Sequence, residues 1–157
     1  MRTHPPPRRT VLGFSLIELM IAIAILGIVG SLAYPSFMGS IRKGRRAEAF
    51  AALSAVQQAQ ERWRANNASY ATDLSAAPPA GLGIAATTGG GLYSISLDNV
   101  SATGYDAVAT PVSGTTQVND GNCAKLGVRM SNGNLSYGGA SSAGAVSFAA
   151  TSACWNR

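Results

Sequence analysis

The chain begins with a long apolar segment, and a segment with regularly spaced apolar and polar residues follows it. From Phe14 to Tyr34 only one residue is charged, Glu18. An apolar run of about 20 residues is long enough to cross a bilayer as a helix. Residues 14–35 are therefore predicted to form a membrane-spanning helix with an acid near its start.

The residues after this run follow the period of an amphipathic helix. Apolar or small residues recur every three or four positions, and only the polar Gln60 interrupts them. Such a stripe needs another element to cover it. The helix is therefore predicted to continue over residues 36–66 and to end at Asn66-Asn67, residues that tolerate the left-handed conformation of helix ends. The stripe consists of Ala49, Ala52, Leu53, Val56, Gln60 and Trp63.

The two parts read as one long helix with a weak place between Gly27 and Pro35. A proline inside a helix removes one hydrogen bond and crowds the preceding turn. The simplest interpretation is a kink that affects only the shape of the helix.

The rest of the chain has the pattern of a loop followed by short strands. Residues 67–91 contain two prolines and five glycines, which predicts a loop. Strand-like runs follow at residues 92–97, 105–110, 124–130 and 135–137, and a turn at residues 131–134 joins the last two. Three or four antiparallel strands with one apolar face would cover the helix stripe, so the predicted fold is α+β.

Charge changes this picture only at the amino terminus. The formal net charge is +5, but Arg2, Arg8 and Arg9 lie before the apolar run. Without residues 1–13, nine basic residues face seven acidic ones, a net charge of +2. The composition is therefore a weak argument for binding nucleic acid. The basic run Arg42, Lys43, Arg45 and Arg46 lies just after the apolar segment, where anionic headgroups or acids such as Glu48 are simpler partners than DNA.

The acid inside the apolar run needs an explanation. A charged side chain in a bilayer costs up to about 3 kcal/mol, so an intramembrane Glu18 is a functional hypothesis by default. Cleavage after Gly13 would create an α-amine on Phe14, which titrates near ~7.7 and is mostly protonated at neutral pH. In a stack of helices, the amine of one copy would meet the carboxylate of the next.

The run Gly13-Phe14-Ser15-Leu16-Ile17-Glu18-Leu19-Met20 resembles the class III signal of type IV pilins and pseudopilins. In that family a dedicated membrane peptidase cuts after the glycine and methylates the new terminal phenylalanine. The resemblance implies that Gly13 is the cleavage-site residue, that Phe14 becomes the methylated terminus, and that Glu18 helps a new subunit enter the filament. It also implies that the stretch between Gly27 and Pro35 can lose helicity in the assembled filament.

Two other interpretations of the amino terminus stay open. A secretory signal would be cut after Ser31-Leu32-Ala33, and the mature chain would then begin at Tyr34, although such signals have shorter apolar segments without an acid. A plain membrane anchor explains the length of the run but not Glu18.

Cys123 and Cys154 are the only cysteines, and the only histidine, His4, lies in the leader. In an exported domain such a pair is more naturally a disulfide than a metal site, which needs three or four clustered ligands. The alternative is two free buried thiols. The spacing, together with Trp155 after the second cysteine, resembles the carboxyl-terminal disulfide region of PilE-like or ComP-like minor pilins.

No set of residues suggests catalysis, and no cofactor or metal ion is expected. The loop residues Asn119, Asp120 and Asn122 offer oxygen atoms to calcium, but calcium needs about 6–8 oxygen ligands. The chain is therefore not expected to be an enzyme.

The resemblance implies the pilin fold, with residues 1–13 as a cleaved leader, 14–35 as the transmembrane and assembly half of a long helix, and 36–157 as the head domain. The head comprises helix 36–66, loop 67–91, and a sheet with a disulfide-closed end over 92–157. The expected function is a minor pilin of a type IV pilus that supports pilus biogenesis, twitching motility or adhesion. The alternatives are a DNA-uptake receptor minor pilin and a pseudopilin of type II secretion.

The expected partners are other pilin subunits, the inner membrane before assembly, the prepilin peptidase and the pilus assembly platform. DNA is a partner that the sequence allows but does not favour. The expected location is the bacterial inner membrane for the precursor, with a periplasmic head, and a cell-surface pilus after assembly.

Overall fold

The computed structural model describes residues 13–148 and 153–155. The predicted leader, residues 1–12 together with Gly13, therefore lies almost wholly outside the described residues. The chain divides into two units, residues 1–38 and residues 39–157. Each is described by itself below.

The described part of the first unit is mainly the beginning of one long helix, α1 (Leu16–Arg64). Its apolar side chains lack any cover within the described residues, with exposed fractions of 77% for Leu16 and 75% for Leu32. This segment is long and apolar enough to cross a membrane. The helix continues through Gly27 and Pro35 without a break in its assignment.

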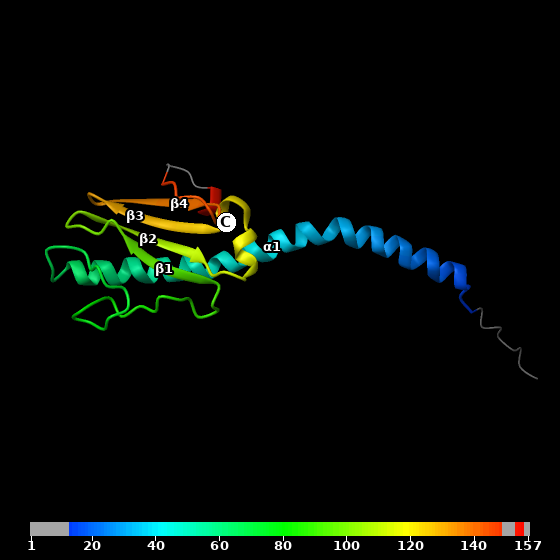
Figure 1. Cartoon of the computed structure of the whole chain (residues 1–157), viewed down its shortest axis with the longest axis horizontal. Coiled ribbons are helices and arrows are strands. Elements are labelled where there is room, and N and C mark those ends of the chain that lie inside the picture. The colour runs from blue at the N-terminus through cyan, green and yellow to red at the C-terminus, as the bar shows by residue number, and fades with distance from the viewer. Residues whose placement is uncertain (1–12, 149–152, 156–157) are drawn as a thin grey trace, which may run out of the picture. The chain divides into compact units, whose positions relative to one another are not determined.

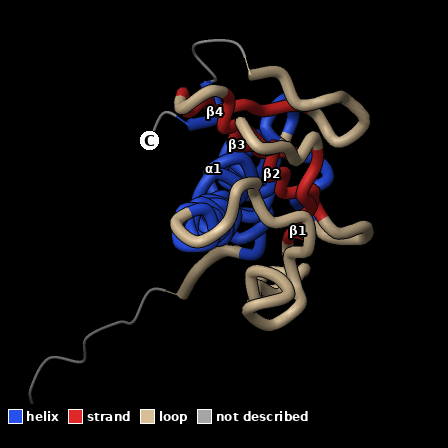
Figure 2. The backbone as a smooth tube through the Cα atoms, turned by 90° about the vertical axis from the view of Figure 1, so that its left-hand side faces the viewer, coloured by secondary structure: helices blue, strands red, loops and turns tan. Residues whose placement is uncertain are grey.

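The second unit is a helix packed on a sheet. Four strands follow α1 in chain order: β1 (Tyr93–Asp98), β2 (Gly104–Pro111), β3 (Lys125–Ser131) and β4 (Asn134–Ala140). They form one antiparallel sheet in the order β1-β2-β3-β4, and the second half of α1 lies against it (Figures 1 and 2). The prediction of an α+β fold with a long helix on a small antiparallel sheet is confirmed.

The core lies between the helix stripe and the inner face of the sheet. Ala49, Leu53 and Val56 of α1 have exposed fractions of 1% or less. Alternate residues of the strands meet them, because successive side chains of a strand point to opposite faces. The buried strand residues in this core are Tyr93, Ile95, Tyr105, Ala107, Ala109, Leu126 and Val128.

Gln60, the polar residue of the predicted stripe, is completely buried. Its amide nitrogen donates to the carbonyl oxygen of Ala71 at 2.9 Å, and its amide oxygen accepts from the Ala71 N–H at 2.9 Å. Both polar groups of the side chain are therefore satisfied, which is what burial of an amide requires. Gln60 therefore attaches the loop that follows α1 to the helix.

The turn between β3 and β4 has the geometry that its sequence favours. Asn132 and Gly133 have φ angles of 49° and 81°. Two successive residues with positive φ form the type I′ turn, whose twist matches that of the flanking strands. The turn sets the register in which Gly127 of β3 faces Gly138 of β4.

Three short 3-10 helices complete the described part of the head. η1 (Thr116–Asn119) and η2 (Gly121–Cys123) lie between β2 and β3, and η3 (Ala153–Trp155) lies near the end of the chain. They carry most of the polar contacts described next.

Candidate functional site

The predicted processing site lies immediately before α1. Gly13 and Phe14 are outside the helix, and the Phe14 side chain is 86% exposed. Nothing among the described residues covers the Gly13–Phe14 bond. No described residue would therefore prevent a peptidase from reaching this bond.

Glu18 is the third residue of α1 and lies in its first turn. The amino-terminal turn of a helix has unpaired N–H groups and a partial positive charge, so a carboxylate is favoured there. Ser15, three residues before Glu18, accepts a backbone hydrogen bond from Leu19 at 3.2 Å. The spacing of Ser15 and Glu18 is that of a capping box, a signal that the sequence analysis overlooked. Glu18 thus has a local reason to be there besides a partner in another subunit.

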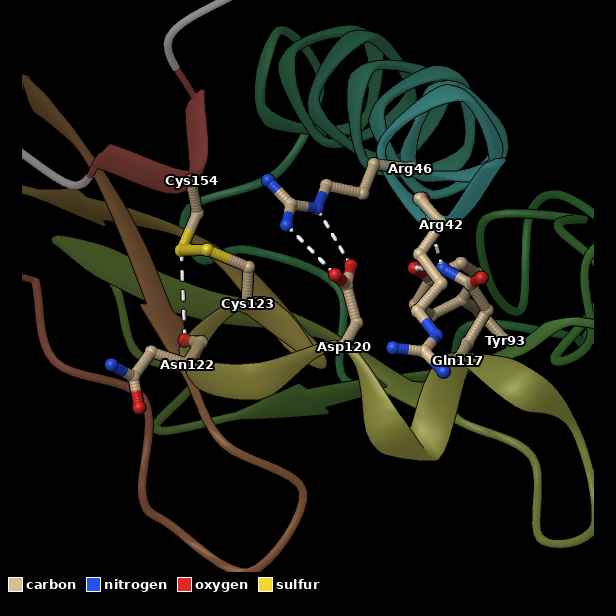
Figure 3. A network of polar contacts seen from close by, with 8 residues as sticks. All are labelled: Arg42, Arg46, Tyr93, Gln117, Asp120, Asn122, Cys123 and Cys154. Atoms are coloured by element: carbon tan, nitrogen blue, oxygen red, sulfur yellow. Dashed lines mark hydrogen bonds and ion pairs between the residues drawn. A yellow bond between two sulfur atoms is a disulfide. The ribbon is translucent and has the colours of Figure 1, made fainter. Parts of the chain in front are cut away.

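A buried ion pair joins α1 to the segment between β2 and β3 (Figure 3). Arg46 Nε and Nη2 donate to the two carboxylate oxygens of Asp120 at 2.7 and 2.8 Å. The two side chains are 11% and 7% exposed. The hydrogen bonds to Asp120 raise the pKa of the Arg46 guanidinium, although burial acts in the opposite direction. The head is therefore fastened to its helix by a charged pair that is mostly shielded from water.

This pair corrects two expectations. The basic run was expected to face anionic headgroups or acids such as Glu48, but Arg46 is buried against Asp120 and Arg45 donates to the Thr116 hydroxyl at 2.6 Å. Asp120 was considered as a calcium ligand with Asn119 and Asn122, but Arg46 takes both of its carboxylate oxygens. The described residues contain no group of three or more His, Cys, Asp or Glu side chains that could hold a metal ion.

Gln117 extends the same polar network. Its buried amide donates to the Arg42 carbonyl oxygen at 3.3 Å and to the Tyr93 hydroxyl at 2.7 Å (Figure 3). Burial is the main cause that raises the pKa of Tyr93. Successive turns of α1 thus hold η1 and η2 through Arg42, Arg45 and Arg46.

Cys123 and Cys154 form a disulfide, as the sequence predicted. The bond brings η3 next to η2 (Figure 3). The Trp155 ring centroid lies 4.6 Å from that of Phe50 and 4.5 Å from that of Tyr137. The Trp155 indole N–H donates to the Gly138 carbonyl oxygen at 2.8 Å. The disulfide therefore fixes an aromatic cluster that seals one side of the core.

Replacing both cysteines by serine is expected to lower the free energy of unfolding by about 3–4 kcal/mol. In the chain-entropy model the disulfide restricts the unfolded chain, and the size of the effect depends on the length of the loop that it closes. Here the two cysteines are 31 residues apart. Denaturant unfolding followed by tryptophan fluorescence measures the change. The control is Trp155→Phe, which keeps the disulfide and an aromatic ring but removes the indole N–H bond to Gly138, and it should lose less stability than the cysteine variant.

A second ion pair, between an arginine and an aspartate, lies on the outer face of the sheet. Arg129 of β3 donates to both oxygens of Asp106 of β2 at 2.6 Å, and the Asn99 amide donates to one of them at 2.7 Å. The hydrogen bonds from Arg129, and then that from Asn99, lower the pKa of Asp106 despite its burial. Phe148 covers the guanidinium, which lies 4.1 Å from the ring centroid.

Acidification is expected to destabilise the head through Asp106. A carboxylate with a lowered pKa in the folded state contributes stability above its unfolded value of ~3.9, and this contribution is lost as the pH falls through the folded value. Asp106→Asn should therefore reduce the loss of stability as the pH falls below about 4. Unfolding measured at a series of pH values tests this, with Glu61→Gln as the control because the Glu61 side chain is exposed and makes no hydrogen bond or ion pair with the described residues. If both variants lose the same amount of stability at low pH, Asp106 is not the cause of the acid sensitivity.

Two family models match the chain. A model described as "Prokaryotic N-terminal methylation motif" matches residues 8–34. A model described as "Type IV minor pilin ComP, DNA uptake sequence receptor" matches residues 35–127. Together the two models cover the predicted assembly segment and most of the head.

Similar proteins occur in pili and in secretion systems. Fimbrial protein EcpC of Eikenella corrodens is 34% identical over 109 residues, which are 69% of this chain and 67% of that protein. Type II secretion system core protein G of Klebsiella pneumoniae is 37% identical over 60 residues, which are 38% of this chain and 43% of that protein. The type IV major pilin PilA of Myxococcus xanthus is 36% identical over 72 residues, or 44% of this chain and 33% of that protein. The chain thus spans less than half of the last two relatives.

Proposed function

This chain belongs to the type IV minor pilin family, and we propose that it is cut after Gly13, methylated at Phe14 and assembled into a surface pilus through the first half of α1. Members of the family are structural subunits that assemble with other pilins into filaments or pseudopili. Family membership also confirms the expectation that the chain is not an enzyme.

The observation that carries this proposal is the position of the signal relative to the helix. Gly13 and Phe14 stand just outside α1, and Glu18 stands inside its first turn. A cut after Gly13 places the new α-amine and the carboxylate at the same end of an exposed apolar helix. Stacked copies of that helix then bring opposite charges together where little water is present, and this strengthens their attraction.

The proposed precursor is anchored in the inner membrane by residues 14–35, with residues 36–157 as a periplasmic head. The prepilin peptidase and the pilus assembly platform are its proposed partners at this stage. The exposed apolar side chains of α1 support a membrane position before assembly, because water would otherwise contact them. In the assembled pilus, neighbouring helices take the place of lipid. The proposed roles of Gly27 and Pro35 belong to this second state, in which the stretch between them loses helicity under tension.

Mass spectrometry of the protein from intact cells tests the processing step. A mature chain that begins with methylated Phe14 is the expected result. A chain that begins at Tyr34 would assign the apolar run to a secretory signal, and an uncut chain would make it a plain anchor. Either of those results contradicts the proposal.

Location separates a pilus subunit from a secretion pseudopilin. We expect the protein in pili sheared from the cell surface, and we expect its deletion to reduce piliation, twitching motility or adhesion. Loss of secreted enzymes with normal pili would assign it to type II secretion instead.

DNA uptake is the second candidate function, because the model that matches residues 35–127 is described as a DNA uptake sequence receptor. The head offers fewer free cations than its sequence indicates, since Arg46 and Arg129 are paired with carboxylates. Fluorescence anisotropy with short DNA duplexes tests this function in the full-length protein. If the protein binds the DNA phosphates, the logarithm of the association constant must fall linearly with the logarithm of the salt concentration. Binding without that salt dependence, or no binding, would exclude a receptor role of this kind.

A further inference from the structure

A hollow at the carboxyl end of α1 has the features of a ligand site. Its volume is about 510 Å³, inside the range of about 300–1,000 Å³ that is usual for small-molecule pockets. One wall is the last two turns of α1, and the other is the loop around Pro78 and Pro79. The lining residues that a ligand would meet include Arg62, Trp63, Asn66, Asn67, Pro78 and Pro79.

Hydrogen bonds fix the helix wall. The Trp63 indole N–H donates to the Ser69 carbonyl oxygen at 3.2 Å, and the Asn67 amide donates to the Trp63 carbonyl oxygen at 2.9 Å. Gln60 holds the following chain at Ala71 through its two hydrogen bonds. The Trp63 ring therefore has a set orientation, and the part of it that is not buried is available to a ligand.

The opposite wall is equally well held. The Asp73 carboxylate accepts from the backbone N–H of Ala76 at 2.8 Å, and the Asp73 carbonyl oxygen accepts from Leu82 at 3.1 Å. Gly81 packs so closely that an added Cβ atom would lie 2.8 Å from the Asp73 carbonyl oxygen. The loop therefore presents the two proline rings without further rearrangement, which lowers the entropic cost of binding.

The polar groups of the hollow favour an anion. Among the described residues, neither the Arg62 guanidinium nor the Asn66 amide makes a side-chain contact, whereas every buried polar group of the two walls named above is paired. The lining contains no carboxylate. Among the described residues Arg62 is thus a cation without a hydrogen-bond or ion-pair partner, and its planar donors match the geometry of a carboxylate.

The apolar groups favour a ring. Trp63, Pro78 and Pro79 offer flat apolar surfaces, and the exposed amides of Asn66 and Asn67 stand at the rim. A sugar ring has an apolar C–H face for such surfaces and hydroxyl groups for the amides. A carboxylate on that ring is the complement of Arg62.

From these features we infer that the hollow between Trp63, Arg62 and the two prolines binds an acidic sugar, a uronic acid residue at the end of or within a polysaccharide. The lining of the site begins at Ala59, well after the predicted assembly segment 14–35 in the sequence, so its occupation is independent of how the amino terminus is processed. The inference goes beyond the structural role of the subunit and gives it a surface for attachment to acidic polysaccharide.

The test uses full-length protein in detergent that carries Trp155→Phe, so that Trp63 is the one remaining tryptophan. Oligomers of galacturonic acid are titrated at low salt, and the fluorescence of Trp63 is recorded. We expect a saturable change. Methyl-esterified oligomers of the same length, which lack the negative charge, are expected to bind about fivefold more weakly or worse.

Two matched variants test the role of the cation. Arg62→Gln should weaken binding by about fivefold or more, and its fold should be intact because the exposed side chain makes no hydrogen bond or ion pair with the described residues. Lys43→Gln removes an exposed cation outside this hollow and should leave binding unchanged.

Several results would overturn the inference. They are the absence of a saturable response, equal binding of the acid and its methyl ester, and unchanged binding by Arg62→Gln. A short DNA duplex that displaces the oligomer and depends more strongly on Arg62 would assign the hollow to nucleic acid instead. Each of these outcomes is separate from the mass of the mature amino terminus, so the processing proposal stands or falls on its own.

Discussion

Replacing Glu18 by valine is expected to abolish or strongly reduce incorporation into the pilus, while membrane insertion and cleavage after Gly13 continue. Valine makes the helix more apolar, so it removes a cost of up to about 3 kcal/mol for the acid in the bilayer. It also removes the proposed partner of the neighbouring Phe14 amine, which is then left charged in a poorly hydrated interior. The measurement is the ratio of the protein in sheared pili to that in the membrane fraction, with the mature amino terminus checked by mass spectrometry.

The capping box gives this prediction a sharper control. Glutamine at position 18 still caps the helix but carries no charge. If the proposed ion pair is what matters, Glu18→Gln must fail in assembly as Glu18→Val does. Ser15→Ala removes the other half of the cap and keeps the charge, so it should assemble at a normal level although it costs the helix about 1 kcal/mol. Normal assembly of Glu18→Gln together with failure of Ser15→Ala would reduce Glu18 to a helix cap.

Replacing Asp120 by alanine is expected to lower the free energy of unfolding of the head by about 3–5 kcal/mol. The reason is that Arg46 would keep its charge in a position where its side chain is only 11% exposed and has lost both carboxylate oxygens. The same substitution frees η1 and η2 from α1 near the disulfide. Denaturant unfolding followed by tryptophan fluorescence gives the change, because Trp63 and Trp155 both lie in the head.

The double variant Arg46→Met with Asp120→Leu tests the cause of that loss. Replacement of a buried pair by apolar residues of similar volume is often neutral, so most of the stability should return. Asp98→Ala, at an exposed position of β1, should change the stability by less than about 0.5 kcal/mol. If the double variant is as unstable as Asp120→Ala, the loss comes from packing and not from an unpaired charge.

Patterns within short stretches of sequence determined most of the fold. The apolar run, the stripe and the alternating strands each depend on near neighbours in the chain, so their periods are visible without any tertiary contact. The helix ends at Arg64, two residues before the predicted end, and the first strand begins at Tyr93, one residue after its predicted start. The Asn132-Gly133 turn was predictable for the same reason, because its geometry requires positive φ at two adjacent residues.

Polar residues were harder to interpret, because their partners lie far away in the chain. Arg46 was expected to face anionic headgroups or an acid such as Glu48, but its partner is Asp120, which is 74 positions away. Gln60 looked like a flaw in an apolar stripe, but it binds Ala71 through both of its amide groups. In each case only the folded chain shows the second group.

By itself the sequence determined one long helix with an apolar first half and a small antiparallel sheet, since propensity, period and turn chemistry are local properties of the chain. The tertiary structure decided which charges are buried, which side chains hold η1 and η2 to α1, and which walls enclose the hollow beside Trp63. The physical reason is that burial and pairing are set by contacts between distant segments, and a linear pattern of residues contains no distances.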